Sequence, residues 1–207
     1  NVSFGNVLGD DRKMLLSRCG DSVRLVDLLD EAIVRAVTAI REKKRDLYGV
    51  DSARVGRMIG IGAVKYADLS TERVKDYVFD LDRMVSFDGN TGPDLQYAHA
   101  RICSIFRRAG VDRASVRHLP ITLDAPQERA LALRLLAYPT AIDTTLETYS
   151  PHKLCTYTYD LATDFTAFYE HCPVLKADEP LRSSRLALAD LTARTLAHAL
   201  GLLGIDA

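Results

Sequence analysis

Apolar residues recur at helical spacing along most of the chain, and this pattern predicts a mainly helical protein. Near the N-terminal end they fall at every third or fourth position, at Leu25, Leu28, Leu29, Ala32, Ile33, Ala36 and Ile40. The same periodicity predicts later helices at about residues 126–137, 140–149, 151–170 and 180–203. Only residues 1–9 have short β-type character, and residues 78–81 form either a short strand or an extended link.

The segment GNTGPDLQYAHARICSIFRRAG, residues 89–110, predicts a helix with two distinct faces. At 100° per residue, an arc about 100° wide contains the apolar residues Leu95, Ala98, Ile102, Ile105, Phe106 and Ala109. Roughly opposite, an arc about 60° wide contains Tyr97, Arg101, Ser104 and Arg108. An aromatic ring thus lies one turn before an arginine on the side away from the core. The simpler interpretation is a solvated stripe with an arginine extending along it.

Residues 51–70 predict a helix that begins at a cap formed by Asp51 or Ser52. This helix contains three glycines, Gly56, Gly60 and Gly62. Each glycine costs about 1 kcal/mol in a helix relative to alanine. Such a cluster therefore indicates that a neighbouring backbone approaches closely.

Composition and charge indicate a globular protein without a dominant charge. The chain has 207 residues, of which 47% are hydrophobic, and 27 Lys and Arg oppose 28 Asp and Glu. A nucleic-acid partner would therefore have to bind at a local patch. No apolar run approaches the roughly 18 residues of a membrane span, and the first residues lack the order of a signal peptide. We expect a soluble, monomeric, cytoplasmic protein with no membrane partner.

The cysteines favour neither disulfides nor a metal site. They are scattered, without a CxxC pair, at Cys19, Cys103, Cys155 and Cys172. A zinc site is the alternative, with His152 and Cys155 on one helix face joined by His171 and Cys172. Adjacent residues of a helix point about 100° apart, which opposes this pairing. We expect no metal.

Several strings, in this order and spacing, resemble the C-terminal half of an arginyl-tRNA synthetase. They are GDDRKMLLSRCGDSVRLVDLLDEA, IGIGAVKYADLSTERVKDYVFDLDRM, GNTGPDLQYAHARI, PHKL, YDLATDFTAFYEHCPVL and SRLALADLTARTLAHALGLLGI. The resemblance covers essentially the whole chain. It implies a mainly α fold: a helical bundle of the class Ia anticodon-binding type, preceded by a short α/β remnant of the catalytic domain.

The resemblance also implies a division of the chain and an activity. Residues 1–85 would be the tail of the class I catalytic domain, and residues 86–207 the helical anticodon-binding domain. The family joins arginine to tRNA(Arg) with ATP and Mg²⁺, and its HIGH signature lies upstream of every matched string. We therefore expect a fragment of that ligase that binds tRNA(Arg) but needs the missing half for arginine and ATP. The fragment alone should need no cofactor and be inactive.

One short stretch resembles the mobile loop that contacts the triphosphate in class I synthetases. In RKMLLSRCG, the residues that match the family's degenerate KMSKS pattern are Lys13, Ser17 and Arg18. Basic groups and a hydroxyl there would steady the charge that develops on the departing pyrophosphate. Leu16 departs from the pattern, because the family often has lysine at that position. An ordinary surface turn is the alternative for this stretch.

The resemblance assigns the polar face of the 89–110 helix to the anticodon loop. Reading unstacked bases requires flat aromatic rings for stacking and arginines for phosphates or base edges. The implied contacts are Gln96, Tyr97 and Arg101. A second helix would add Tyr157, because alternate residues diverge by about 200° and only one of Tyr157 and Tyr159 can face RNA.

The resemblance does not extend to every position of these helices. Asp94 departs from the family, which commonly has an aromatic residue there. Phe165 and Tyr169, one turn apart, are expected in the core. A different class of function, a free-standing helical paralogue that binds RNA or protein without ligase activity, is the alternative hypothesis.

Overall fold

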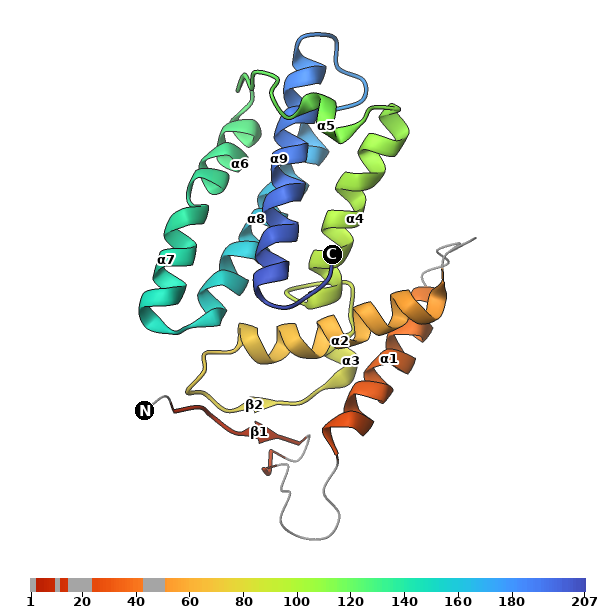
Figure 1. Ribbon diagram of the computed structural model, residues 1–207, viewed down its shortest axis with the longest axis vertical. Coiled ribbons are helices and arrows are strands. Elements are labelled where there is room, and N and C mark those ends of the chain that lie inside the picture. The colour runs from red at the N-terminus through yellow and green to blue at the C-terminus, as the bar shows by residue number, and fades with distance from the viewer. Residues whose placement is uncertain (1–2, 10–11, 15–23, 43–50) are drawn as a thin grey trace.

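The computed structural model describes residues 3–9, 12–14, 24–42 and 51–207. Its larger part is an α-helical bundle (Figure 1). The bundle helices are α4 (Gly92–Ala109), α6 (Pro126–Leu136), α7 (Tyr138–Thr148), α8 (Pro151–His171) and α9 (Leu181–Leu202), with the short α5 (Arg113–Val116) at one end. The bounds of α6, α7, α8 and α9 agree with the predicted helices to within two residues, the usual uncertainty of helix ends, and α4 lies within the predicted segment 89–110.

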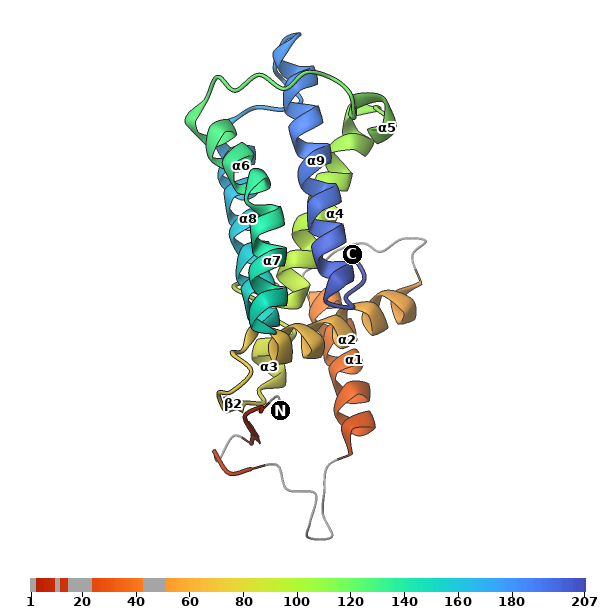
Figure 2. The same ribbon diagram turned by 60° about the vertical axis from the view of Figure 1, so that its left-hand side comes forward.

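A smaller layer lies beneath the bundle. It contains β1 (Val7–Leu8), α1 (Leu25–Glu42), α2 (Ser52–Ser70), β2 (Tyr77–Val78) and α3 (Leu81–Met84). The two strands pair in parallel, with Val7 opposite Tyr77. Helix α2 crosses the lower end of the bundle and also packs on α1, as both views show (Figures 1 and 2). The mainly helical class with a short α/β part is therefore confirmed.

The main core is formed where α4, α8 and α9 pack together. Its fully buried side chains include Leu95, Ile102, Leu161, Phe165, Phe168, Leu188, Leu196 and Leu200. Tyr66 of α2 joins the same cluster, and burial raises the pKa of its phenol. Its hydroxyl contacts the Asn90 side chain and, at 3.1 Å, the carbonyl oxygen of Cys155. Tyr66 precedes the boundary that we propose between two domains, at residues 85 and 86, yet its side chain packs in the core of the bundle.

Side-chain caps fix the start of α2, as the sequence predicts, and also the start of α4. Asp51 accepts the backbone N–H groups of Ala53 and Arg54 at the start of α2. Thr91 accepts the N–H of Asp94 at 3.3 Å, with Pro93 in the first turn of α4. These contacts satisfy donors that the helix itself leaves unpaired. The four-residue helices α3 and α5 were not predicted, because they are too short to show a period.

The glycines of α2 permit the close contact that the sequence indicates. A Cβ atom at Gly60 would lie 2.7 Å from the Cα of Ile33, so the backbones of α1 and α2 touch. At Gly62 a Cβ would lie 3.0 Å from the side-chain nitrogen of Gln96 on α4. Helix α2 therefore packs closely on both of its sides. Gly201 of α9 differs, because a Cβ there would meet nothing within 4 Å.

We predict that Gly60→Ala lowers the melting temperature. The added methyl group would collide with backbone atoms, which cannot move aside, and overpacking of this kind typically costs about 1–3 kcal/mol. Gly201→Ala is the matched control, since an open helical site should gain stability by up to about 1 kcal/mol. Thermal melts followed by circular dichroism measure both. Equal melting temperatures for Gly60→Ala and the unaltered chain would contradict the close packing.

A buried ion pair ties α6 to α9. Glu128 is fully buried and accepts the backbone N–H groups of Asp124 and Ala125 at 2.7 and 2.8 Å. Its other oxygen accepts the Nε–H of Arg185 at 2.6 Å. Burial raises the pKa of the Glu128 carboxyl, but the Ala125 N–H, the Arg185 guanidinium and the Asp124 N–H together bring it below its ordinary value of 4.5. The pair therefore stabilises the fold only while Glu128 is ionised.

We predict that Glu128→Gln costs about 3–5 kcal/mol at neutral pH, because it leaves the Arg185 charge buried without its partner. A lowered folded-state pKa means that the stabilisation is complete above 4.5 and is lost as the pH falls through the folded value. The difference between the two proteins in denaturant unfolding should therefore shrink below pH 4.5. Glu147→Gln, on the exposed surface of α7, is the control. A difference that does not change with pH would refute the role of the charge.

No helix within the described part of the chain is long and apolar enough to span a membrane.

Candidate nucleic-acid interface

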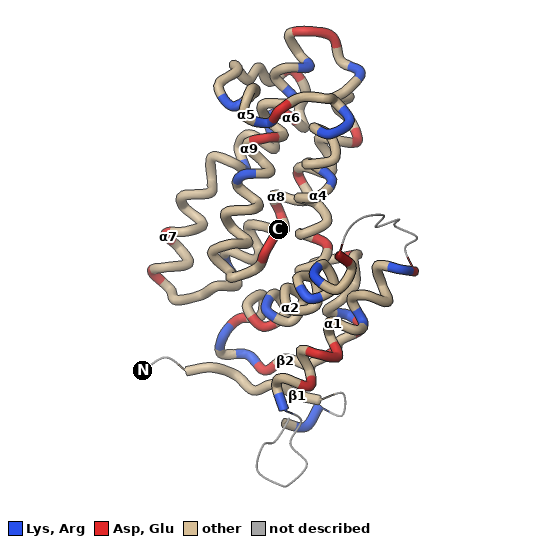
Figure 3. The backbone as a smooth tube through the Cα atoms, turned by 45° about the vertical axis from the view of Figure 1, so that its right-hand side comes forward, with Lys and Arg blue, Asp and Glu red and all other residues tan. Residues whose placement is uncertain are grey.

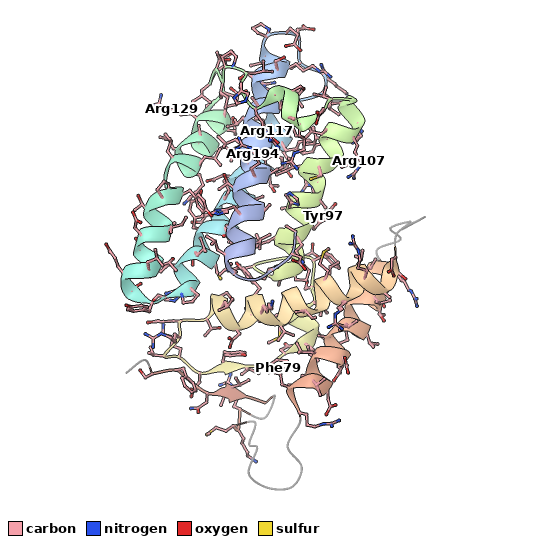
Figure 4. The ribbon with its side chains drawn as sticks, viewed as in Figure 1. Phe79, Tyr97, Arg107, Arg117, Arg129 and Arg194 are labelled. Carbon is pink, nitrogen blue, oxygen red and sulfur yellow. The ribbon has the colours of Figure 1, made fainter. Side chains whose placement is uncertain are left out.

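Helix α4 buries the face that the sequence assigns to the core. Its fully or nearly fully buried apolar residues are Leu95, Ala98, Ile102, Ile105 and Phe106, while Ala109 is half-buried. Tyr97 and Arg101 are both half-exposed on another side of the helix. Tyr97 lies in the lower half of α4 (Figure 4). The predicted two-faced helix is confirmed, and Tyr97 and Arg101 of its polar side line a groove with residues of α8.

A groove of about 400 Å³ runs between α4 and α8. This α4–α8 groove is lined by Asp94, Tyr97, Ala98 and Arg101 of α4 and by Tyr159, Ala162, Thr163, Thr166, Ala167 and Glu170 of α8. Two tyrosines from different helices therefore meet in one depression, and small residues lie between them. An aromatic base is flat and could rest on such rings.

Arg101 lies between two aromatic rings of this region. Its guanidinium carbon is 5.8 Å from the centre of the Tyr97 ring and 5.6 Å from the centre of the Tyr169 ring. Tyr169 in turn stacks on Phe165 with ring centres 6.1 Å apart. Phe165 is buried, as predicted for the core, whereas Tyr169 is only half-buried and helps to orient Arg101.

The α4–α8 groove has charges of both signs. Arg101 is its only cationic lining residue among those described, and Asp94 and Glu170 contribute carboxylates. A phosphate would meet repulsion from these carboxylates, which leaves the surface poorly suited to backbone binding. Base edges present both donors and acceptors, so a mixed lining is better suited to bases.

The structure corrects the choice of Tyr157 over Tyr159. Tyr157 is 6% exposed, and its hydroxyl donates to the Arg134 carbonyl oxygen at 3.0 Å. Burial raises the pKa of Tyr157. Its ring belongs to the core, and Tyr159 is the residue that reaches the groove. The sequence spacing could have indicated that Tyr157 is buried. Tyr157 follows Leu154 by three residues and precedes Leu161 by four, which places it on the apolar stripe of α8.

The structure also places Gln96 inside the molecule. Its side chain is 5% exposed, and its amide nitrogen donates to the carbonyl oxygen of Asp206 at 2.6 Å. A weaker contact of 3.4 Å joins the same nitrogen to the carbonyl oxygen of Met58. Gln96 therefore holds α2, α4 and the C-terminal residues together, and its predicted contact with RNA is wrong for this conformation. No periodic pattern distinguishes a buried glutamine from an exposed one.

Only part of the predicted triphosphate loop can be placed. Lys13 is exposed, and its carbonyl oxygen accepts the N–H of Gly9 at 2.8 Å. Ser17 and Arg18, together with Leu16, lie outside the described residues. In the described part of the chain, no three His, Cys, Asp or Glu side chains are grouped so as to hold a metal ion. Both histidine-linked cysteines of the zinc hypothesis, Cys155 and Cys172, are buried in the core.

Two protein-family models match the chain. Residues 95–207 match the DALR anticodon binding domain, and residues 1–81 match the catalytic domain of class I tRNA synthetases for arginine. The α4–α8 groove lies mainly within the first of these segments.

Relatives and solved structures agree with these models. An arginine–tRNA ligase of Thermobifida fusca is 53% identical over 100% of this chain and 36% of its own length. The corresponding ligase of Frankia casuarinae is 54% identical over 100% of this chain and 35% of its own length. The arginyl-tRNA synthetase structure of Thermus thermophilus aligns with a TM-score of 0.88 at 37% identity, over 100% of this chain and 34% of that one.

A second structure, the Plasmodium falciparum arginyl-tRNA synthetase, aligns with a TM-score of 0.85 at 33% identity, over 99% of this chain and 34% of that one. The chain thus spans about a third of the length of these relatives. Since the DALR model alone matches more than half of the chain, the family follows directly. The chain belongs to the arginyl-tRNA synthetase family, as a segment that joins the end of a class I catalytic domain to a DALR anticodon-binding domain.

Proposed function

We propose that the chain is the tRNA-binding part of an arginine–tRNA ligase and that its α4–α8 groove receives unstacked anticodon bases of tRNA(Arg). The observation that supports this most strongly is the meeting of Tyr97, Arg101 and Tyr159 in one groove of the segment that matches an anticodon-binding domain. Two rings and a guanidinium are the groups that single-stranded RNA recognition uses most. The relatives named above favour this function over a free-standing paralogue.

Each residue has a separate task in this proposal. The rings of Tyr97 and Tyr159 stack on bases and gain affinity from contact area without regard to base identity. Arg101, held against two rings, donates to the edge of a base that enters the groove. The carboxylates of Asp94 and Glu170 accept hydrogen bonds from exocyclic amino groups of bases. Together these contacts would favour particular bases.

The rest of the activity belongs to the longer enzyme. We infer that the loop with Lys13, Ser17 and Arg18 contacts ATP in an enzyme that uses Mg²⁺ and attaches arginine to tRNA(Arg). The match of residues 1–81 to a class I catalytic domain supports this assignment. Basic side chains would neutralise charge on the departing pyrophosphate. A monomeric, cytoplasmic protein is part of the same proposal.

We predict that Tyr97→Ala and Tyr159→Ala each weaken binding of tRNA(Arg) by about 1–3 kcal/mol, the usual value of one base–aromatic stack. Replacement by Phe should cost much less, because the ring remains. Fluorescence anisotropy with labelled tRNA measures these affinities. Tyr157→Phe is the control: loss of its hydrogen bond to Arg134 should lower stability by roughly 1 kcal/mol and leave affinity unchanged. Unchanged binding by both alanine variants would refute the groove as the anticodon site.

We predict that Arg101→Ala reduces discrimination between tRNA(Arg) and tRNAs with other anticodons. A lost base-edge contact typically costs about 1–3 kcal/mol and acts only on the matching base. Competition binding with several purified tRNAs, repeated over a range of salt concentrations, measures this ratio. Uniform weakening of all tRNAs, with a salt slope smaller by roughly one unit, would instead mean that Arg101 contacts a phosphate.

A further inference from the structure

Three arginines converge on one buried carboxylate at the end of the bundle distant from α2. Asp190 of α9 is fully buried and accepts the Nε–H of Arg113 at 2.8 Å and the Nε–H of Arg194 at 2.9 Å. Arg117, just after α5, approaches the same carboxylate with its Nε at 3.9 Å. The three side chains come from α5, the residue that follows it, and α9. Asp190 therefore gathers positive charge from several elements.

Two of the three guanidinium groups, those of Arg117 and Arg194, keep their outer ends available. Each of the three arginines approaches Asp190 through Nε, the nitrogen nearest its own backbone. Arg117 and Arg194 have side chains 49% and 44% exposed, and their terminal nitrogens have no partner among the described residues. Arg113 is 28% exposed and donates its Nη1–H to the sulfur of Cys103 at 3.5 Å. Asp190 thus orients the guanidinium groups and leaves donors directed to the outside.

A fourth arginine extends this region. Arg107 is exposed and follows Cys103 by one turn of α4, so it lies on the flank of α4 that faces Arg113. Blue segments gather on α5 and the adjoining part of α9 in Figure 3, and Figure 4 shows Arg117 beside Arg194 with Arg107 further along α4. The nearby Asp112 caps α5 through its bond to the N–H of Ala114. The region thus contains four arginines and the two carboxylates Asp112 and Asp190, an excess of positive charge although the whole chain has a net charge of −1.

We propose that this arginine surface, formed by Arg107, Arg113, Arg117 and Arg194, binds the sugar–phosphate backbone of the RNA stem next to the loop in the groove. Guanidinium groups with outward N–H pairs match phosphate oxygens in charge and geometry. RNA stems are recognised largely through their backbones, independently of sequence. The inference rests on the proposed function, since it assumes an RNA ligand.

The position of Arg107 on α4, the helix that also lines the groove, favours RNA over an acidic protein. Helix α4 has the groove residues Tyr97 and Arg101 on one flank and the Cys103 and Arg107 side on the other. An α-helix with its side chains is only about 10–12 Å across, so one RNA hairpin can contact both flanks. Its bases would enter the α4–α8 groove, and its phosphates would meet the arginines. One ligand then accounts for two surfaces of different electrostatic character, a groove with charges of both signs and a surface rich in arginine.

The test compares Arg117→Gln and Arg194→Gln with the matched control Arg129→Gln. Arg129 is exposed on α6, at the other edge of the bundle, and its loss changes the net charge equally (Figure 4). Affinities of the full chain for tRNA(Arg) and for a tRNA with another anticodon are measured over a range of salt concentrations. We expect each surface variant to weaken both tRNAs severalfold and equally, and to reduce the salt slope by roughly one unit. Arg129→Gln should change neither quantity.

Several outcomes would overturn the proposal. Unchanged binding by both surface variants would do so, and so would an equal change in Arg129→Gln, which would indicate a general charge effect. Weaker binding with a lower melting temperature and an unchanged salt slope would show a structural role only. Tyr97→Ala measured in parallel separates the two proposals: if it alone weakens binding, the arginine surface is wrong, and if only the arginine variants do, the groove is wrong.

Discussion

The close packing of α2 on both of its sides is the constraint on which the rest of the structure depends. Gly60 lets the backbone of α2 touch that of α1, and Gly62 makes room for Gln96 of α4. A Cβ at Gly92 would in turn lie 2.7 Å from the carbonyl oxygen of Gly62. The first turn of α4 therefore rests directly on α2. Since α4 forms one side of the candidate groove, a displacement of α2 would also displace the candidate recognition surface.

The sequence predicts those parts of the fold that a regular pattern determines. The apolar arc of α4 and the glycines of α2 are both visible without coordinates, because each reflects packing along a single helix. The four-residue helices α3 and α5 leave no comparable pattern, and they depend on caps such as Asp80 and Asp112. The periodic apolar positions of α1 begin at Leu25, but the buried residues of this helix are Ala32, Ala36 and Ile40, and Leu25 is 65% exposed.

The candidate site shows the same limit. Tyr97 and Arg101 could be selected because α4 has a clear polar side. Tyr157 and Tyr159 point in different directions from α8, but this alone does not tell which of them is exposed. In the structure, Tyr159 lines the groove beside α4 and Tyr157 is buried. Gln96 is buried because its amide donates to the carbonyl oxygen of Asp206, a residue 110 positions later in the sequence that folds back against α4. Contacts of that range depend on tertiary structure rather than on local periodicity.

Buried carboxylates have a common role in this bundle, which is to fix cations. Glu128 holds Arg185 in the interior, where the guanidinium also donates to the Pro173 carbonyl oxygen at 2.8 Å. Asp190 holds arginines at the surface instead. The two cases differ in how the guanidinium hydrogens are used. Arg185 donates them to groups of the protein, whereas the exposed arginines around Asp190 have N–H groups that a ligand could accept. Burial of an acid can therefore serve either the fold or recognition.

Three alanines line the α4–α8 groove, Ala98, Ala162 and Ala167, and small side chains have a consequence for the shapes of RNA that the proposed site would accept. In a paired stem every base has its faces covered by its neighbours and its edge directed inward, so it has no surface to offer the tyrosines. Only a loop whose bases point outward can enter. In the proposed function, the groove would therefore select an opened RNA conformation as well as particular bases, and a misfolded transcript of correct sequence would not bind.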